Sequence, residues 1–97
     1  MTKAEIIVQI SDMTGLTKVE TEIVVNGFLA SVSNAMSKGE TINFRGFGNF
    51  SVKYQKGRYG VNPNTKEKIW IGEKYKPVFK ASKTLKEKVM NSKKVKS

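Results

Sequence analysis

The side chains in this sequence that could do chemistry are mostly cationic. The chain has 18 Lys and Arg residues against 8 Asp and Glu residues, and its formal net charge is +10. It contains no Cys and no His, which excludes a disulfide framework, a thiolate or imidazole metal site, a cysteine nucleophile and a histidine-based triad. The chemistry that these cations favour is binding, because lysine and arginine neutralise polyanions and release their condensed counterions.

The positive charge is concentrated in the second half of the chain. Residues 1–44 hold three lysines and five acidic residues, whereas residues 45–97 hold fifteen basic and three acidic residues. A near-neutral segment joined to a strongly basic one indicates a scaffold and a contact surface for a polyanion. The alternative is that the lysines only form a solvated face.

Composition limits the class of protein. At 97 residues we expect one domain, and 38% hydrophobic residues are too many for a disordered tail and too few for a membrane protein. The longest apolar runs, such as Ile6–Val8 and Ile23–Val25, fall far short of the ~20 residues that span a bilayer. We therefore expect a soluble intracellular protein without a signal peptide.

Two helices are predicted at the N-terminal end. Thr2 and Glu5 form a capping box, and Thr17 and Glu20 form a second one. Apolar residues follow each box at helical spacing, and Gly15 and Gly39 stand where the two helices should end.

The apolar period then changes from helical to alternating. Residues 41–44 and 50–54 read as two strands of a hairpin, joined by a turn at Gly46–Asn49 in which glycines supply positive φ. Residues 55–68 are basic and rich in turn formers, and Asn62–Thr65 suits a type I turn. The strand pattern returns at 69–71 and 75–79, so we expect a long β-ribbon arm, mobile in the free protein, that reverses near Pro63.

Ser82 should cap a short last helix, and residues 91–97 should form a fraying basic tail. The apolar stripe of the second helix is too wide for one short partner helix to cover. We therefore favour a dimer over the alternative, in which the sheet of the same chain covers this stripe.

The motifs together resemble the HU/IHF family of bacterial histone-like DNA-binding proteins over residues 1–90. No single motif is specific, but the ordered set spans 45 residues without gaps. The resemblance is carried by Gly46-Phe47-Gly48-Asn49-Phe50, Arg58, Gly60, Asn62-Pro63, Thr65, Pro77, Phe79-Lys80, Lys83, Leu85-Lys86 and Val89.

The resemblance implies an α+β fold: an N-terminal helical hairpin, a three-stranded antiparallel sheet with a long β-ribbon arm, a short C-terminal helix and an intertwined dimer. It implies a DNA-binding domain at 1–90, with a dimerisation hairpin at 1–39, an arm at 53–76 and a tail at 91–97. The arms would wrap the DNA minor groove, as the proteins of this family are described to do.

The resemblance also assigns roles to residues. Pro63 would be the wedge that enters a base step, with Val61 as added apolar surface, and Asn62 could bond minor-groove acceptors. Val61, Gln55 and Lys66 depart from the family, which often has Arg, a basic residue and Gly at these positions. The predicted DNA-binding residues are Lys3, Arg45, Lys53, Lys56, Arg58, Asn62, Pro63, Lys66, Lys68, Lys80, Lys83 and Lys86.

Some of these residues have a second interpretation. Arg45 could clamp a phosphate or form a structural salt bridge, and Lys86 could contact DNA or simply be solvated. Trp70 could stack on a base, but on an arm strand we expect cross-strand packing and do not assign it to the site. Phe47, Phe50 and Phe79 are expected in the core.

The predicted function is non-enzymatic: an architectural protein that bends and compacts duplex DNA largely without sequence specificity, as a homodimer in the bacterial cytoplasm and nucleoid. No cofactor, metal, membrane or small-molecule substrate is expected. A site-specific IHF-like subunit, a heterodimer with a paralogue, a phage origin and an RNA or virion packaging protein remain alternatives. A nuclease is disfavoured because the eight acidic residues are scattered.

Overall fold

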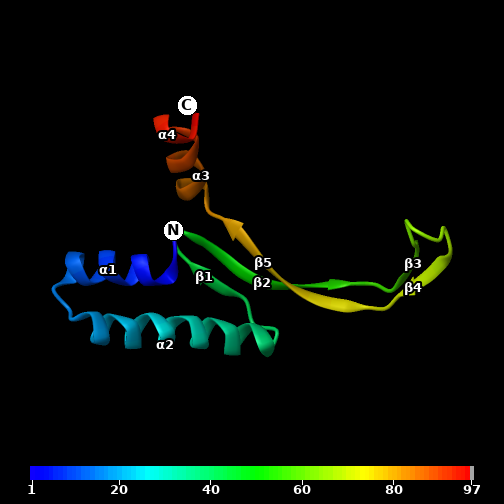
Figure 1. Ribbon diagram of the computed structural model, residues 1–97, viewed down its shortest axis with the longest axis horizontal. Helices are drawn as coiled ribbons and strands as arrows, with labels where there is room; N and C mark the ends of the chain where they lie inside the picture. The colour runs from blue at the N-terminus through cyan, green and yellow to red at the C-terminus, as the bar shows by residue number, and fades with distance from the viewer. Residues whose placement is uncertain (97) are drawn as a thin grey trace. The chain divides into compact units, whose positions relative to one another are not determined.

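A computed structural model describes residues 1–96 of the chain (Figure 1). It divides into two compact units, Met1–Ala35 and Met36–Ser97, which are described separately below. The first unit is helical, and the second holds the strands and the C-terminal helices. The predicted α+β class, with its helical hairpin, three-stranded sheet and short C-terminal helix, is confirmed.

The N-terminal unit contains α1 (Lys3–Thr14) and most of α2 (Lys18–Ser37), and the structure shows the Thr2 cap of the first predicted capping box and both bonds of the second. The Glu5 N–H donates to the Thr2 hydroxyl at 3.2 Å. The second box is reciprocal, because the Glu20 N–H donates to Thr17 Oγ1 at 3.1 Å and the Thr17 N–H donates to Glu20 Oε1 at 3.4 Å. Gly15 is left-handed, with φ 78°, so it ends α1 as expected.

The helices leave most of their apolar side chains uncovered in the single chain. Among the described residues, Ile7 is the only large apolar residue that is buried, and 9% of its surface is still exposed to solvent. On the apolar stripe of α2, 60% of Val24 and 48% of Phe28 are exposed. The wide apolar stripe read from the sequence is therefore a real surface feature of the single chain.

The sheet of the second unit is antiparallel, with strand order β1 (Ile42–Phe44), β2 (Gly48–Gln55) and β5 (Lys74–Ala81). The predicted turn is corrected by the structure: it covers Arg45–Phe47, and Gly48 and Asn49 already belong to β2. Only Gly46 of the two turn glycines has positive φ, at 83°. Gly48 is required for space instead, because a Cβ there would lie 2.6 Å from the Lys80 carbonyl oxygen and from a Phe79 ring carbon.

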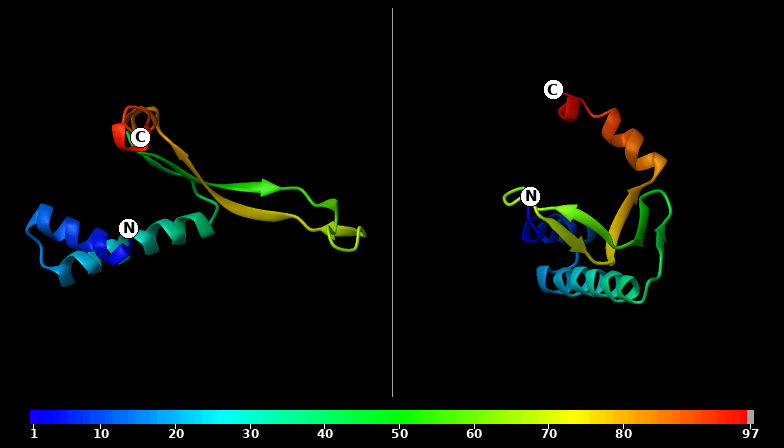
Figure 2. Two further views of the ribbon diagram at one scale, coloured as in Figure 1. Left: turned by 45° about the horizontal axis from the view of Figure 1, so that its top comes forward. Right: turned by 90° about the vertical axis from the view of Figure 1, so that its right-hand side faces the viewer.

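Beyond Phe50, β2 has no strand on its β1 side, so the sheet continues as the two-stranded β2–β5 ribbon. The ribbon ends in a second ladder of β3 (Arg58–Val61) and β4 (Lys68–Ile71). Figure 2 shows the twist of the paired strands between the sheet and this terminal ladder. The predicted hairpin arm is therefore present, in one register from Gly48↔Ala81 to Val61↔Lys68.

The C-terminal region contains α3 (Lys83–Met90), capped by Ser82, whose hydroxyl accepts from the Leu85 N–H at 3.1 Å. Within the predicted basic tail, residues 93–96 form the single turn α4 (Lys93–Lys96); Ser97 lies outside the described residues. Within residues 1–96, no helix has the length and apolar character needed to cross a membrane.

Candidate nucleic-acid interface

The β2–β5 ribbon has one cationic face. Side chains alternate along a strand, and residues paired across strands share a face. The register pairs Asn49 with Lys80, Lys53 with Lys76 and Gln55 with Lys74, which places all of these residues on the same side. We call this side the cationic face; its charged members are Lys53, Lys74, Lys76 and Lys80.

The opposite face of the ribbon is aromatic and apolar. Phe50 pairs with Phe79 at a ring-centroid distance of 4.8 Å, and Tyr54 pairs with Tyr75 at 5.2 Å. The Tyr54 hydroxyl donates to Glu73 Oε2 at 2.8 Å, and this hydrogen bond is the main cause that raises the pKa of Tyr54 above 10.0. The three rings of Phe47, Phe50 and Phe79 pack against one another, but the expected core position is wrong for two of them in the single chain, because Phe47 is 49% and Phe79 is 41% exposed.

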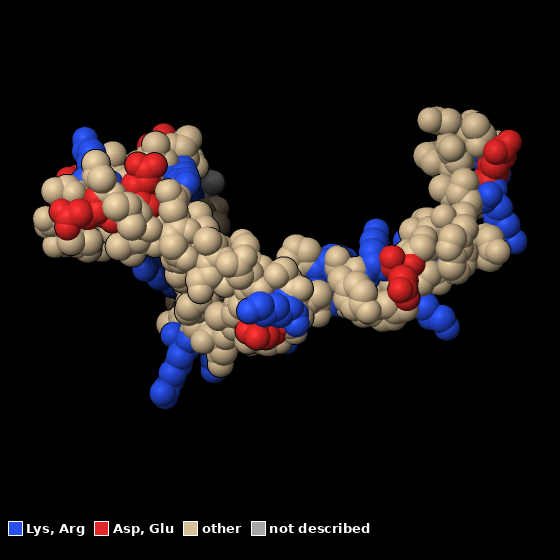
Figure 3. Space-filling model, turned by 90° about the horizontal axis from the view of Figure 1, so that it is seen from below, with Lys and Arg blue, Asp and Glu red and all other residues tan. Residues whose placement is uncertain are grey.

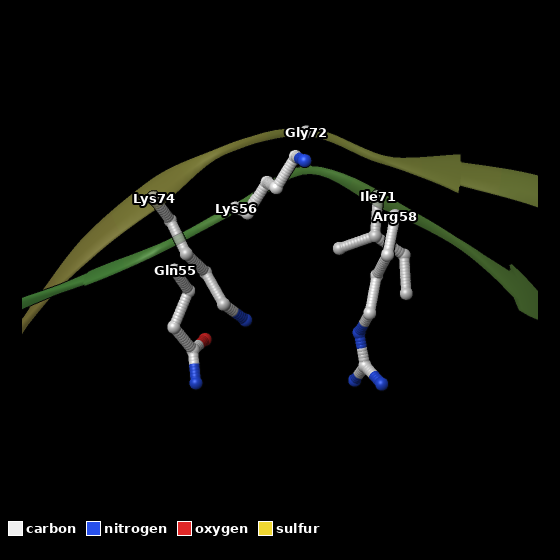
Figure 4. Close-up of a pocket in the computed structure, with 6 residues that line it drawn as sticks. All are labelled: Gln55, Lys56, Arg58, Ile71, Gly72 and Lys74. Atoms are coloured by element: carbon white, nitrogen blue, oxygen red, sulfur yellow. The ribbon is translucent and has the colours of Figure 1, made fainter.

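The alternation is inverted where the two ladders meet. Neither ladder includes residues 56–57 or 72–73. In an unbroken strand Gln55 and Arg58 would point to opposite faces, because their separation is odd. Instead, Gln55 and Lys74 line one hollow together with Arg58 and Ile71, and Figure 4 shows these four side chains extending to the same side. The break thus brings Arg58 onto the cationic face.

A second aromatic pair stands on the terminal ladder. Tyr59 lies opposite Trp70, with the rings 5.0 Å apart in an edge-to-face arrangement. A Cβ on Gly57 would approach Trp70 Cζ2 to 2.5 Å, so the indole packs closely over the Gly57 backbone. The expectation that Trp70 packs across strands is confirmed. Lys68, a predicted DNA contact, lies with its Nζ 5.5 Å from the centre of the Tyr59 ring.

The tip of the arm is a wider turn than the type I turn that we predicted. The Lys66 N–H donates to the Asn62 carbonyl at 2.8 Å, which closes five residues rather than four. The Asn62 side-chain oxygen accepts from the Asn64 N–H at 2.9 Å and from the Thr65 N–H at 3.4 Å. Pro63 is exposed inside this turn, and no cis peptide bond occurs in the described chain.

Lys66 adopts a backbone conformation that favours glycine. Its φ is 63°, and it is the only non-glycine residue with positive φ in the described part of the chain. A side chain in this left-handed region costs about 1–2 kcal/mol relative to the right-handed one. The departure from the family pattern at position 66, where Gly is often found, thus falls at a position whose geometry suits glycine.

The other predicted residues lie closer to the sheet or on the helices. Lys80 is on the cationic face, Lys56 lines the hollow beside Arg58, and Lys3 is the first residue of α1. On α3, exposed Lys83 lies 4.0 Å from Glu87, a separation at which a surface pair contributes little. Arg45 sits in the β1–β2 turn, and no described carboxylate lies within the 4.0 Å that a salt bridge requires.

Sequence reasoning missed Lys74 and Lys76. The signal was present, since lysines at 74, 76 and 80 alternate with Tyr75, Pro77 and Phe79 along one strand. Figure 3 shows lysine and arginine side chains distributed along the extended arm. In residues 1–96 no three acidic side chains gather closely enough to hold a metal ion.

Comparison with known proteins agrees with this geometry. The family model described as "Bacterial DNA-binding protein" matches residues 1–90. The DNA-binding protein HU of Thermus thermophilus is 43% identical over 89 residues, which cover 92% of each chain. Integration host factor subunit beta of an Azoarcus species is 40% identical over 90 residues, covering 92% of this chain and 96% of the relative.

A solved structure has the same fold. The cocrystal structure of Anabaena HU with DNA matches 95% of this chain and 100% of its own, at 33% identity and a TM-score of 0.88. Members of this family are architectural DNA-binding proteins rather than enzymes, in agreement with the prediction. The chain therefore belongs to the HU/IHF family of bacterial histone-like DNA-binding proteins.

Proposed function

We propose that this protein is an architectural factor that binds duplex DNA through the minor groove, largely without sequence specificity, and bends and compacts it. The observation that carries the proposal is the two-faced arm. One face presents Lys53, Lys74, Lys76 and Lys80, and the break in the ladders adds Arg58 to it. Cations spaced along an extended ribbon suit a phosphate backbone, since they contact it without reading base edges.

The tip of the arm suits insertion into the base stack. Pro63 offers an exposed apolar ring without an N–H, so it can enter a base step without leaving a donor unpaired. Val61, which is 62% exposed, adds apolar surface close by. Unstacking costs a few kcal/mol, and the additional contacts of bent DNA with the basic protein offset that cost.

We propose that the working unit is a homodimer formed through the helical hairpin at residues 1–39. The apolar side chains of α2 support this, because single chains seldom expose so many large apolar groups on one helix. On α3 and α4, Met90 is 67% exposed and shares an apolar hollow with Leu85 and Val89. A second copy would cover such surfaces with two-fold symmetry.

Within the cell, these properties suit a role on the bacterial nucleoid. The domain at 1–90 and its arm at 53–76 would carry DNA binding, and the basic tail at 91–97 would add unspecific attraction. A pairing with a paralogue would use the same apolar surfaces as the homodimer.

Binding to intact, nicked and cruciform duplexes at two salt concentrations tests the proposal. A preference for nicked and cruciform DNA is expected, because pre-bent DNA saves deformation energy. Equal affinity for all three would contradict bending.

Replacing Pro63 with Ala should reduce bending, measured by fluorescence transfer between the duplex ends, more than it reduces affinity.

Integration host factor subunit beta among the relatives supports a second candidate, a site-specific bending subunit. Competition with random duplex distinguishes the two candidates. Random DNA should compete fully against an unspecific binder and poorly against a site-specific one. Competition with RNA tests the packaging alternative, since an architectural DNA protein should prefer the duplex.

A further inference from the structure

The tip of the arm carries a side chain whose hydrogen-bonding capacity is almost fully used by the protein itself. Asn62 donates its backbone N–H to the Glu67 carbonyl at 2.9 Å and accepts the Lys66 N–H at 2.8 Å. Its side-chain oxygen accepts from Asn64 and Thr65. The side-chain amino group of Asn62 has no hydrogen-bond partner among the described residues. This amino group can only donate, so it is a free hydrogen-bond donor at the tip of the arm.

The orientation of this amide is determined by chemistry. Both groups that face the Asn62 side-chain carbonyl are backbone N–H donors, at 2.9 and 3.4 Å. A flipped amide would place its own N–H₂ against these donors and lose both bonds. The turn therefore holds the carbonyl inward and leaves the amino group as the free polar end, on the residue that precedes the exposed Pro63.

A group that can only donate discriminates between base pairs in the minor groove. An A·T pair presents only acceptors there, adenine N3 and thymine O2, whereas a G·C pair adds the guanine 2-amino donor. An unpartnered donor gains a hydrogen bond at A·T and meets another donor at G·C. We infer that Asn62 biases the protein toward A·T pairs at the base step that its arm tip enters.

This inference rests on the proposed function, because it requires the arm tip to lie in the minor groove. It adds a local preference to binding that is otherwise unspecific. The expected size is that of one hydrogen bond gained or lost, about three- to tenfold in affinity. Because the unpartnered side-chain group of Asn62 is a donor in the minor groove, the bias should depend on the 2-amino group of the purine and not on the major-groove edge.

Base analogues isolate that group without changing the protein. A short duplex is nicked at one step so that the kink forms there, and the flanking pair is A·T, G·C, inosine·C or 2,6-diaminopurine·T. Inosine lacks the 2-amino group of guanine, and diaminopurine adds it to adenine. We expect A·T and inosine·C to bind about three- to tenfold more tightly than G·C and diaminopurine·T. Equal affinities for the four duplexes would overturn the inference.

The analogues also change groove width and stiffness, so a variant must separate these effects. Asn62→Asp retains an oxygen that can accept from Asn64 and Thr65 and replaces the amino donor with an acceptor. Its added negative charge weakens binding to all four duplexes, so the readout is the ratio between them. The preference should vanish or reverse toward G·C, and a preference unchanged in the variant would assign it to DNA shape and overturn the role of Asn62.

The same experiment distinguishes failure of the inferred base-pair preference of Asn62 from failure of the proposed bending function. Intact duplexes of each composition run beside the nicked ones. If nicked DNA is bound better than intact DNA but all four pairs are bound equally, only the reading by Asn62 is overturned. If nicking brings no advantage for any pair, the proposed bending function itself fails.

Discussion

The backbone conformation of Lys66 is unfavourable for a residue with a side chain, whereas its positive charge should favour DNA binding. Replacing Lys66 with glycine should therefore stabilise the tip of the arm and weaken DNA binding. Its φ of 63° costs about 1–2 kcal/mol with a side chain and little with glycine. Glycine also increases the entropy of the open tip, worth about 0.4–1 kcal/mol. Lys66→Gly should therefore stabilise the closed tip by a net of about 0.5–1 kcal/mol.

Hydrogen exchange measures this effect at the Asn62 N–H, which bonds to the Glu67 carbonyl across the base of the turn. A net gain of about 0.5–1 kcal/mol slows exchange at this amide about two- to fivefold. DNA binding should change in the other direction. If Lys66 contacts one phosphate in each copy of a dimer, its loss reduces the slope of log affinity against log salt by about 1.8.

Lys66→Ala is the matched control, because alanine keeps the Cβ that makes positive φ costly but removes the cation. It should lose the same salt dependence as Lys66→Gly and show no gain in protection at Asn62. If both variants protect Asn62 equally, the strain argument is refuted. If neither changes the salt slope, Lys66 is not a phosphate contact.

Three further predictions concern the ribbon. Gly48→Ala should destabilise the protein by about 1–3 kcal/mol in urea unfolding, because the new Cβ meets backbone that cannot move aside; unchanged stability would contradict the close approach at 2.6 Å. The raised pKa of Tyr54 means that its hydrogen bond stabilises the fold below pH 10 and is lost as pH rises through the folded pKa. Phenolate absorbance should show Tyr54 titrating lower in Glu73→Gln, and an unchanged titration would refute the bond. Gly57→Ala should displace Trp70, the only tryptophan, and shift its fluorescence, whereas an unshifted spectrum would show that the indole does not pack there.

The features that could be predicted from the sequence are those governed by neighbouring residues. The Thr2 and Thr17 caps, the end of α1 at Gly15 and the Ser82 cap each need only a few adjacent groups, and all four are present. Strand alternation in residues 48–55 and 74–81 likewise follows from a period of two. If the alternation of side chains is applied to every residue of 74–81, it also places Lys74 and Lys76 on the cationic face.

The features that were not predicted depend on contacts across the ribbon. Gly57 and Gly72 mark residues 56–57 and 72–73 as weak points of the two strands, but nothing local shows that the break brings Arg58 to the side of Gln55. The need for Gly48 arises from Phe79 and Lys80 on another strand, so a turn was the wrong explanation for that glycine. The five-residue turn at the tip depends on the Asn62 side chain, which competes with the backbone for the N–H groups.

The proposed function depends most on the cationic face as the DNA-binding surface, and salt-dependent binding tests this directly. Lys74→Gln/Lys76→Gln removes two charges from that face, and Lys38→Gln/Lys88→Gln removes the same net charge elsewhere. On a nicked duplex, the first variant should reduce the slope of log affinity against log salt by about 3.6 for a dimer, and the second should leave it nearly unchanged. Equal reductions in the two variants would show that only net charge matters and would contradict a defined DNA-binding face on the arm.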